Sequence, residues 1–414
     1  MAASAQQYFV EQYGSQFLIN GKPYYFIGAN YWYGGLLALQ KDPIKGKQRL
    51  IHELDFLHSQ GVNNLRVLVG SEGEGRINGV DRVKPALQNQ HHVFDVKVLK
   101  GLDFLLMEMA KRKMYAVLYL SNNWEWSGGF LQYLNWNKQI DDETLKRKLS
   151  WDEQRDYTSK FYTCDACKID YQKQLSLILQ HQNFYTGKKY IDEPAIMTWE
   201  LANEPRPMRP DVVEAYKKWI VNTADYIKSK DKNHLITIGT EGFMGTEENW
   251  DLFKEIHASK AINYLTIHIW PKNWGWFKHI PTNENLPEVI EKTVTYIKQH
   301  EKIAIELKKP LVVEEFGLPR DEHAFDPATT TKLRDEYFKN IFALWAGSKI
   351  TKGAIAGCNF WAFGGQSQPI KGQLLWKDGD DFSGDPPQEE QGLNTIFDSD
   401  HTTWNVIKSF TRIY

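Results

Sequence analysis

AIMTWELANEP, residues 195–205, is an apolar run that ends in a carboxylate and a proline. Residues 195–201 are mostly aliphatic, β-branched or aromatic, which is typical of a parallel strand buried on both faces. Asn203, Glu204 and Pro205 follow, and the proline favours a turn at this point. We therefore predict a buried strand with the carboxylate of Glu204 just beyond its carboxyl end.

The same kind of run recurs along the whole chain, and amphipathic helical patterns alternate with the runs. The eight predicted strands are 24–30, 63–69, 114–120, 195–201, 234–240, 264–270, 310–316 and 354–363. The predicted helices are 47–60, 98–112, 157–181, 211–230, 249–258, 286–307, 330–346 and 402–412. Eight such units without a flexible linker predict an α/β fold, a single (β/α)8 TIM barrel.

The domain organisation follows from the same pattern. We expect residues 1–414 to form one catalytic domain, with about residues 1–16 as an N-terminal extension. Long interruptions follow predicted strands three, four, six and eight, and they predict extended loops at the C-terminal face of the barrel. Barrel enzymes place their chemistry at this face.

The charge balance suits a neutral ligand. The 50 Lys and Arg residues nearly match the 52 Asp and Glu residues, so neither nucleic acid nor a membrane surface is expected as a partner. No apolar run approaches the roughly 20 residues of a membrane span. The chain contains 15 Trp, and exposed ring faces would stack on sugars, although a tryptophan-rich core would explain the same composition.

A second carboxylate occupies the corresponding place on another predicted strand. Glu315 lies near the end of the run 310–316 and shortly before Gly317. Because parallel strands end at one mouth, Glu204 and Glu315 are expected to face a common cleft. Cleavage of a glycosidic bond requires one carboxylic acid and one carboxylate, and their separation decides between retention and inversion. Taken singly, each could instead be a capping or ion-pairing residue.

Glu314 and Glu200, which lie near the two candidate catalytic glutamates in the sequence, are expected to lie outside the cleft. Strand alternation is expected to put Glu314 and Glu315 on opposite faces, so that only one enters the cleft. Glu200 shares the parity of Glu204 but lies deeper in the strand, which favours a buried ion pair.

The segments Asn203-Glu204-Pro205 and Glu315-Phe316-Gly317 resemble the signature of glycoside hydrolase family 5, in the large clan of retaining barrels. The similarity extends from about residue 17 to the C-terminus. Four shorter motifs resemble the β-mannanase branch of that family: NNW (122–124), GG (128–129), QY (132–133) and GDPPQ (384–388). The resemblance implies Glu204 as acid/base and Glu315 as nucleophile, with no metal or organic cofactor.

The resemblance also implies roles around the two glutamates. Arg66 would hold Glu315 ionised while burial keeps Glu204 protonated. Asn203 would bond the sugar 2-hydroxyl, and Trp361 would form the floor of the subsite at the cleaved bond. The other expected substrate-binding residues are His268, Trp270, Trp124, Asn30 and Trp32.

Several of these assignments leave an alternative. Trp270 stands where the family usually has Tyr, and an indole N–H can donate to a carboxylate but cannot accept a hydrogen bond. His268 could be a core histidine. Trp124 and Trp32 could be rim residues packed on their neighbours rather than on a sugar.

Three weaker signals remain. Cys164 and Cys167 form a CxxC motif on a helical pattern, so a local disulfide or two free thiols is expected rather than a metal or redox site. The acidic segment 378–385 lacks the ligand spacing of an EF-hand, which favours a solvated turn. The opening MAASAQQYF has neither the basic nor the apolar region of a signal peptide.

The sequence thus predicts an endo-β-1,4-mannanase for mannan, glucomannan or galactomannan, a monomer that is secreted although this chain carries no signal peptide. An exo-acting β-mannosidase or a cellulase-like β-glucanase would keep both glutamates, and the insertion of about 365–395 could block one end of the cleft. A non-catalytic sugar-binding protein would tolerate the loss of either glutamate. A metal-dependent hydrolase or an aldolase would need ligand or lysine sets that the predicted strand ends lack.

Overall fold

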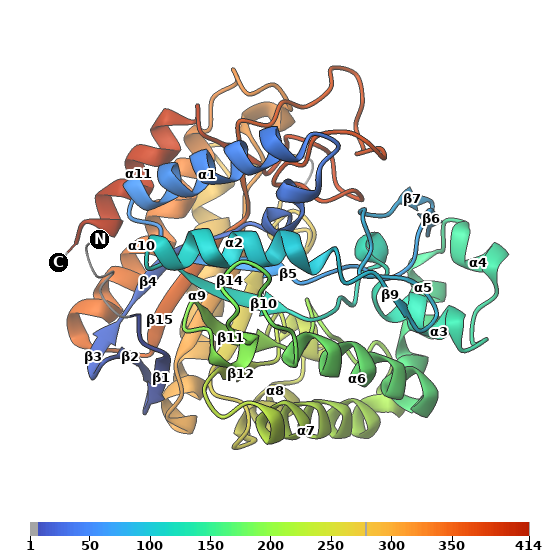
Figure 1. Cartoon of the computed structure of the whole chain (residues 1–414). Coiled ribbons are helices and arrows are strands. Elements are labelled where there is room, and N and C mark those ends of the chain that lie inside the picture. Colours follow the sequence, from blue (N-terminus) through green and yellow to red (C-terminus); the bar gives the residue numbers. More distant parts are fainter. Residues whose placement is uncertain (1–6, 278–279, 414) are drawn as a thin grey trace.

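Parallel strands form the centre of the molecule, and helices surround them (Figure 1). The computed structural model describes residues 7–277 and 280–413. The strands, in spatial order, are β12 (Leu235–Thr237), β11 (Ile196–Glu200), β10 (Tyr115–Tyr119), β5 (Asn64–Leu68), β4 (Phe26–Asn30), β15 (Ile355–Phe360), β14 (Leu311–Phe316) and β13 (Leu265–Ile269). Every residue of these strands is buried, as expected when side chains fill the inside and helices cover the outside.

Backbone hydrogen bonds between the regions of β12 and β13 bring the ends of this sheet together. The amide of Asn263 donates to the carbonyl of Ile236 at 2.8 Å, and the amide of His268 donates to that of Glu241 at 3.1 Å. The predicted (β/α)8 barrel is therefore confirmed. Within the described residues, the eight outer helices are α1 (Pro43–Ser59), α2 (Leu99–Lys111), α6 (Asp165–Leu179), α7 (Val213–Lys230), α8 (Trp250–Ala258), α9 (Leu286–Leu307), α10 (Lys332–Thr351) and α11 (His401–Thr411).

One predicted helix, 157–181, is broken in two. Helix α5 (Trp151–Ser159) leads into a 3-10 turn, Lys160–Thr163, and α6 starts afresh with Cys164 as its N-cap. Cys164 and Cys167 form a disulfide across the first turn of α6, which is one of the two expected states. The apolar periodicity continues through this break, so the sequence pattern alone did not reveal it.

A small antiparallel sheet covers the amino end of the barrel. It consists of β1 (Val10–Tyr13), β2 (Gln16–Ile19) and β3 (Lys22–Tyr24). Val10 and Phe17 are buried against barrel-interior residues such as Val117 and Val312. The described part of the expected extension is therefore part of the fold, while residues 1–6 lie outside the described residues.

The opposite end carries elements that the sequence reading missed, well separated from β1–β3 in Figure 1. They are α3 (Gly129–Trp136), α4 (Asp142–Lys146), the hairpins β6 (Arg76–Ile77) to β7 (Val80–Asp81) and β8 (Gln88–Gln90) to β9 (Val93–Phe94), and the pair β16 (Phe363–Gly365) with β17 (Ile396–Phe397). Strands β16 and β17 bracket the insertion 366–395. The chain between β5 and α2 is thus a further long loop.

The expectation of a solvated turn at 378–385 is wrong for Asp385. Its buried carboxylate accepts the backbone N–H groups of Gly392 at 2.8 Å and Asn394 at 3.1 Å, so it anchors the insertion. Asp381, by contrast, is half exposed and pairs with Arg49 at 2.6 Å.

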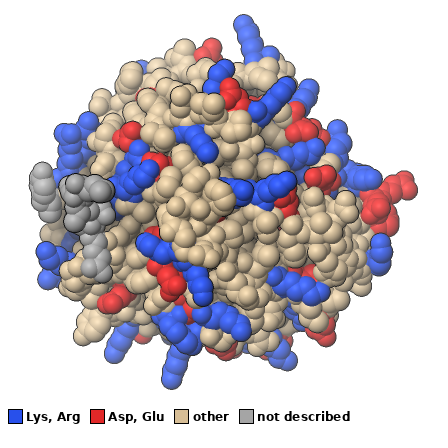
Figure 2. Space-filling view, viewed as in Figure 1, with Lys and Arg blue, Asp and Glu red and all other residues tan. Residues whose placement is uncertain are grey.

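The described surface has mixed charge. On the face in Figure 2, basic and acidic side chains are interspersed among uncharged residues. Among the described helices, none combines the length and the apolar character that crossing a bilayer requires.

Candidate active site

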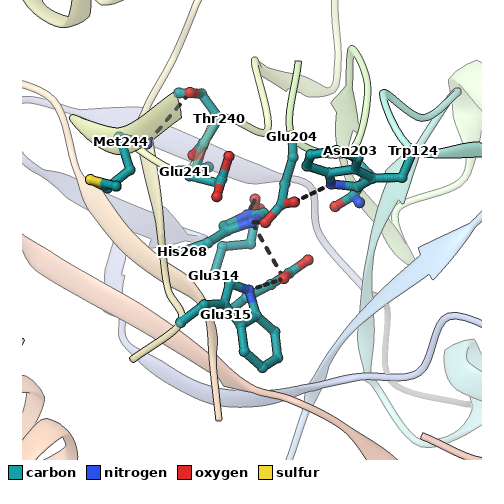
Figure 3. Close-up of polar contacts among 12 residues, drawn as sticks. Trp124, Asn203, Glu204, Thr240, Glu241, Met244, His268, Glu314 and Glu315 are labelled. Carbon is teal, nitrogen blue, oxygen red and sulfur yellow. Dashed lines mark hydrogen bonds and ion pairs between the residues drawn. The ribbon is translucent and has the colours of Figure 1, made fainter. Parts of the chain in front are cut away.

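Glu204 and Glu315 meet at the carboxyl end of the barrel. Glu204 lies four residues beyond the end of β11, and Glu315 lies in β14. A carboxylate oxygen of each, together with a ring nitrogen of His268, lies within 4.8 Å of the others (Figure 3). Both side chains are at least nine-tenths buried, so the two carboxylates face each other with little access to solvent.

Glu204 is held in a backbone conformation that few L-residues adopt. Its φ angle is +50°, in the left-handed region, and its amide donates to the carbonyl of Gly239 at 2.8 Å. Such a conformation persists only where surrounding contacts enforce it, and it is commonly found at functional sites.

Arg66 is the fixed positive charge beneath this pair. Its guanidinium is fully buried, lies 2.6 Å from the carboxylate of Glu200 and donates to that of Glu315. It also donates to the side-chain oxygens of Asn203 at 2.6 Å and Asn30 at 3.1 Å. The expected buried ion pair of Glu200 is therefore present, and one cation organises both strand ends.

The expectation that Glu314 and Glu315 point to opposite faces is wrong. Glu314 also reaches Arg66, at 3.6 Å, and its carboxylate lies 3.2 Å from Nε2 of His268. The register between β13 and β14 shifts here, because Ile267 pairs with Val313 but His268 pairs with Glu315. Such an irregularity breaks the alternation of side chains. Only Glu315 lines the cavity, while Glu314 lies inside the barrel.

His268 bridges the glutamates. Its Nδ1 lies 2.7 Å from Glu204 and 3.4 Å from Glu315, and its Nε2 faces Glu314. Burial lowers the pKa of His268 to about 4, so the ring is neutral near neutral pH and carries a single N–H. His268 is fully buried and does not line the cavity, so its contacts are with the carboxylates and not with the open space of the cavity.

The two carboxyl groups have high proton affinity. Burial raises the pKa of Glu204 and of Glu315, and repulsion by Glu204 raises the pKa of Glu315 further. Arg66 and the indole N–H of Trp270 lower the pKa of Glu315. The pair therefore retains one proton to higher pH than an isolated glutamate would.

Three predicted tryptophans surround the pair. The indole of Trp270 donates to Glu315 at 3.0 Å, so a tryptophan here can make the hydrogen bond to that carboxylate. The indole of Trp124 donates to Glu204. Trp361 meets Trp270 edge to face, with ring centroids 5.6 Å apart.

These residues line a cavity of about 520 Å³. This volume is within the usual range of ligand pockets. Trp124, Trp151, Arg206 and Met244 belong to its lining, as do Trp361 and Glu389. Arg206, which directly follows Pro205, pairs with Glu241 at 2.6 Å. Arg206, Glu241, Trp151 and Glu389 were not predicted from the sequence. For Arg206, its position directly after Asn203-Glu204-Pro205 was a signal that could have identified it as a cavity residue.

Four of the predicted substrate-binding residues do not line the cavity: Arg66 and His268, which contact the two glutamates, and Trp32 and Asn30. Trp32 is only 1% exposed: its indole donates to the carbonyl of Gly384 at 3.0 Å and its ring packs against Phe382, so the insertion covers it. Asn30 is equally buried and donates to the carbonyl of Glu314 at 2.9 Å. It positions Arg66 and β14 rather than a ligand.

Two groups of metal-ligand type occur among the described residues. One is Glu204, His268 and Glu315, and the other is His91, His92 and the buried Asp170. In the first group Arg66 already donates to Glu315, and in the second the ammonium of Lys173 lies 3.1 Å from Asp170. A protein cation therefore contacts one carboxylate of each group.

Comparisons with known proteins agree with this geometry. The family model described as "GH family 5 beta-mannosidase-like" matches residues 7–413. Mannan endo-1,4-beta-mannosidase 4 of Solanum lycopersicum is 29% identical, covering 86% of this chain and 84% of its own. Mannan endo-1,4-beta-mannosidase 7 of Arabidopsis thaliana is 28% identical, covering 98% and 85%.

A solved structure is similar over nearly the whole chain. The glycoside hydrolase family 5 mannosidase from Rhizomucor miehei is 30% identical with a TM-score of 0.86, and the match covers 97% of this chain and 96% of that one. The chain therefore belongs to the β-mannosidase-like group of glycoside hydrolase family 5 and is a glycosidase.

Proposed function

We propose that the protein is an endo-β-1,4-mannanase that cleaves mannan, glucomannan or galactomannan with retention of configuration. One carboxyl oxygen of Glu204 lies within 4.8 Å of one carboxyl oxygen of Glu315, and this proximity carries the proposal of retention. Retaining enzymes place the carboxyl groups about 5–5.5 Å apart, whereas inverting enzymes leave about 6.5–9.5 Å for a water molecule. The observed pair is too close for direct attack by water between them.

The reaction proceeds in two displacements. Glu315 attacks the anomeric carbon while Glu204 donates its proton to the departing oxygen, and a glycosyl ester on Glu315 forms. Glu204, now ionised, removes a proton from water, and the resulting attack breaks the ester and regenerates both groups. No metal or organic cofactor enters either step of this proposal.

The hydrogen bonds around the pair support these proton positions. The cation of Arg66 and the indole of Trp270 both donate to Glu315, which favours its ionised form. A neutral His268 has one N–H but faces a carboxyl group on each nitrogen. Both ring nitrogens have a hydrogen-bond partner when the protonated carboxyl group of Glu204 donates to Nδ1 and the N–H at Nε2 donates to Glu314.

Two cavity residues are proposed to hold the sugar at the cleaved bond. The amide of Asn203 is fixed by Arg66 at its oxygen and lies beside Glu204, where its nitrogen can donate to the sugar 2-hydroxyl. The indole of Trp361 provides an apolar floor. Contacts to the 2-hydroxyl strengthen as the oxocarbenium-like transition state forms.

Exo-acting release of mannose is a second candidate. The insertion 366–395 covers Trp32, and its Glu390 pairs with Lys272 at 2.7 Å and with His323 at 3.2 Å. Gln388 and Glu389 of the insertion line the catalytic cavity together with Trp361. The similar Rhizomucor miehei protein is described as a mannosidase, and a mutant of it has been solved with mannosyl-fructose.

Product analysis tests the proposal and separates the two candidates. Purified protein is incubated with linear mannan, glucomannan and carboxymethylcellulose, and the products are followed over time. We expect mixed mannooligosaccharides from both mannans at early times. Mannose alone would favour the exo-acting candidate, and cleavage of carboxymethylcellulose alone would overturn the assignment to mannans.

The rate should depend on pH in a bell-shaped manner. Glu204 must be protonated to act as the acid. Because burial raises its pKa, activity should persist above the pH at which an ordinary glutamic acid ionises, and it should then fall about tenfold per pH unit. Below the lower of the two pKa values of this coupled pair, both carboxyl groups are protonated, Glu315 can no longer attack, and activity falls again. The profile of kcat/KM against pH measures both limbs, and an alkaline limb unchanged in Glu204→Ala on an activated substrate would contradict the assignment.

We further propose that residues 1–414 act as one catalytic domain, as a secreted monomer. Its polymeric substrate lies outside the cell, and the disulfide between Cys164 and Cys167 is typical of oxidising compartments. Secretion and sedimentation assays would test the two statements separately.

A further inference from the structure

Trp151 is a large aromatic side chain at the rim of the catalytic cavity. It lines the same cavity as Glu204, yet half of its surface is exposed. Its ring centroid lies 6.1 Å from that of Trp124, and the two ring planes are inclined by only 32°. The mechanism described above does not use this side chain.

The helix that carries Trp151 is firmly anchored. Ser150 and Glu153 form a capping box, which fixes the backbone at the first residue of α5. Arg155 donates to the carbonyl of Met208 at 2.9 Å, and Arg209 pairs with Asp156 at 2.7 Å. These contacts tie α5 to the segment that follows Glu204, so the exposed ring is held in place relative to the acid.

The position of Trp124 identifies which side of the cleaved bond this region serves. The general acid protonates the departing oxygen, so residues in contact with Glu204 away from Glu315 lie on the leaving-group side. Trp124 donates to Glu204, and Trp151 lies one ring further out, at a spacing comparable to one pyranose unit. Arg206 lies over the Trp124 ring at 5.5 Å, which helps to hold that ring in place.

We infer that Trp151 forms an outer leaving-group subsite, on which the second sugar beyond the cleaved bond of a β-1,4-linked oligosaccharide stacks. This inference rests on the proposed function for the identity of the sugar. Its ligand is a neutral pyranose, since an aromatic face binds the C–H surface of a sugar without requiring charge. The subsite makes the enzyme prefer substrates with two or more sugars on the leaving side.

The test compares Trp151→Ala and Trp151→Phe with the wild type on mannobiose, mannotriose and mannotetraose labelled with ¹⁸O at the reducing end. We expect the ratio of kcat/KM for mannotriose over mannobiose to fall about tenfold in Trp151→Ala, a loss of one stacking contact. In Trp151→Ala, the ¹⁸O label should show a smaller fraction of cleavage events that release a product of two sugars from the reducing end than in the wild type. Trp151→Phe, which keeps a ring, should recover part of the ratio.

Phe184→Ala serves as the matched control, because Phe184 is 64% exposed and is not part of the cavity lining. Its ratio should equal that of the wild type. An unchanged ratio in Trp151→Ala, or an equal loss on all substrates with a lowered melting temperature, would overturn the inference. If the wild type cleaves no mannoside, the proposed function fails; the same series of β-glucosides then tests Trp151 independently.

Discussion

Glu315→Ala should abolish turnover of mannan, lowering kcat by about 10⁴-fold or more, as loss of a covalent nucleophile does. Azide should restore part of the activity on an activated aryl mannoside, because it fits the space left by the carboxylate. Azide then attacks from the face that Glu315 occupied and gives an α-mannosyl azide. Steady-state kinetics and NMR of the product measure both effects.

Glu314→Gln is the matched control for this variant. Glu314 contacts the same Arg66 but does not line the cavity, so its loss tests whether activity falls merely because Arg66 lacks a partner. We expect a smaller loss and no azide product. Substantial mannan cleavage by Glu315→Ala, or a β-mannosyl azide from it, would exclude Glu315 as nucleophile.

Glu204→Ala should produce a loss that depends on the leaving group. On mannan, kcat/KM should fall by about 10²–10⁴-fold because the departing oxygen needs a proton. On 2,4-dinitrophenyl mannoside the first step needs no acid, so the glycosyl ester should accumulate in a burst. Azide should then speed its breakdown and yield a β-mannosyl azide.

Glu241→Gln provides the comparison for Glu204. Glu241 is a buried carboxylate of the same cavity, paired with Arg206, but it does not contact the reacting atoms in the proposed mechanism. Glu241→Gln should lower the activity on mannan and on 2,4-dinitrophenyl mannoside by similar factors. Equal losses on mannan and on the activated mannoside in Glu204→Ala would rule out its role as the general acid.

The strand pattern was sufficient to predict the barrel, because buried parallel strands must be apolar on both faces. All eight predicted strands overlap the observed ones, from β4 to β15. The positions of Glu204 and Glu315 could likewise be predicted from the sequence, since a carboxylate at the end of a buried strand can only face the barrel mouth or pair with a cation. Their separation required the three-dimensional arrangement.

The wrong predictions concern side chains whose position depends on segments far away in the sequence. The position of Glu314 depends on the register between β13 and β14, which no local pattern encodes. Trp32 is buried by Phe382, a residue far along the chain that packs on it only after folding. Trp151 had a local signal for the start of a helix in Ser150 and Glu153, but its place beside Trp124 depends on the fold of a whole loop.

The covering of Trp32 by the insertion has an evolutionary consequence. Trp32 lies just beyond strand β4, and the segment between β16 and β17 covers it. Changes confined to that segment can lengthen or shorten the groove while every group that handles protons stays untouched. Remodelling of this one surface segment would therefore change the extent of the cleft while Glu204 and Glu315 stay on the barrel.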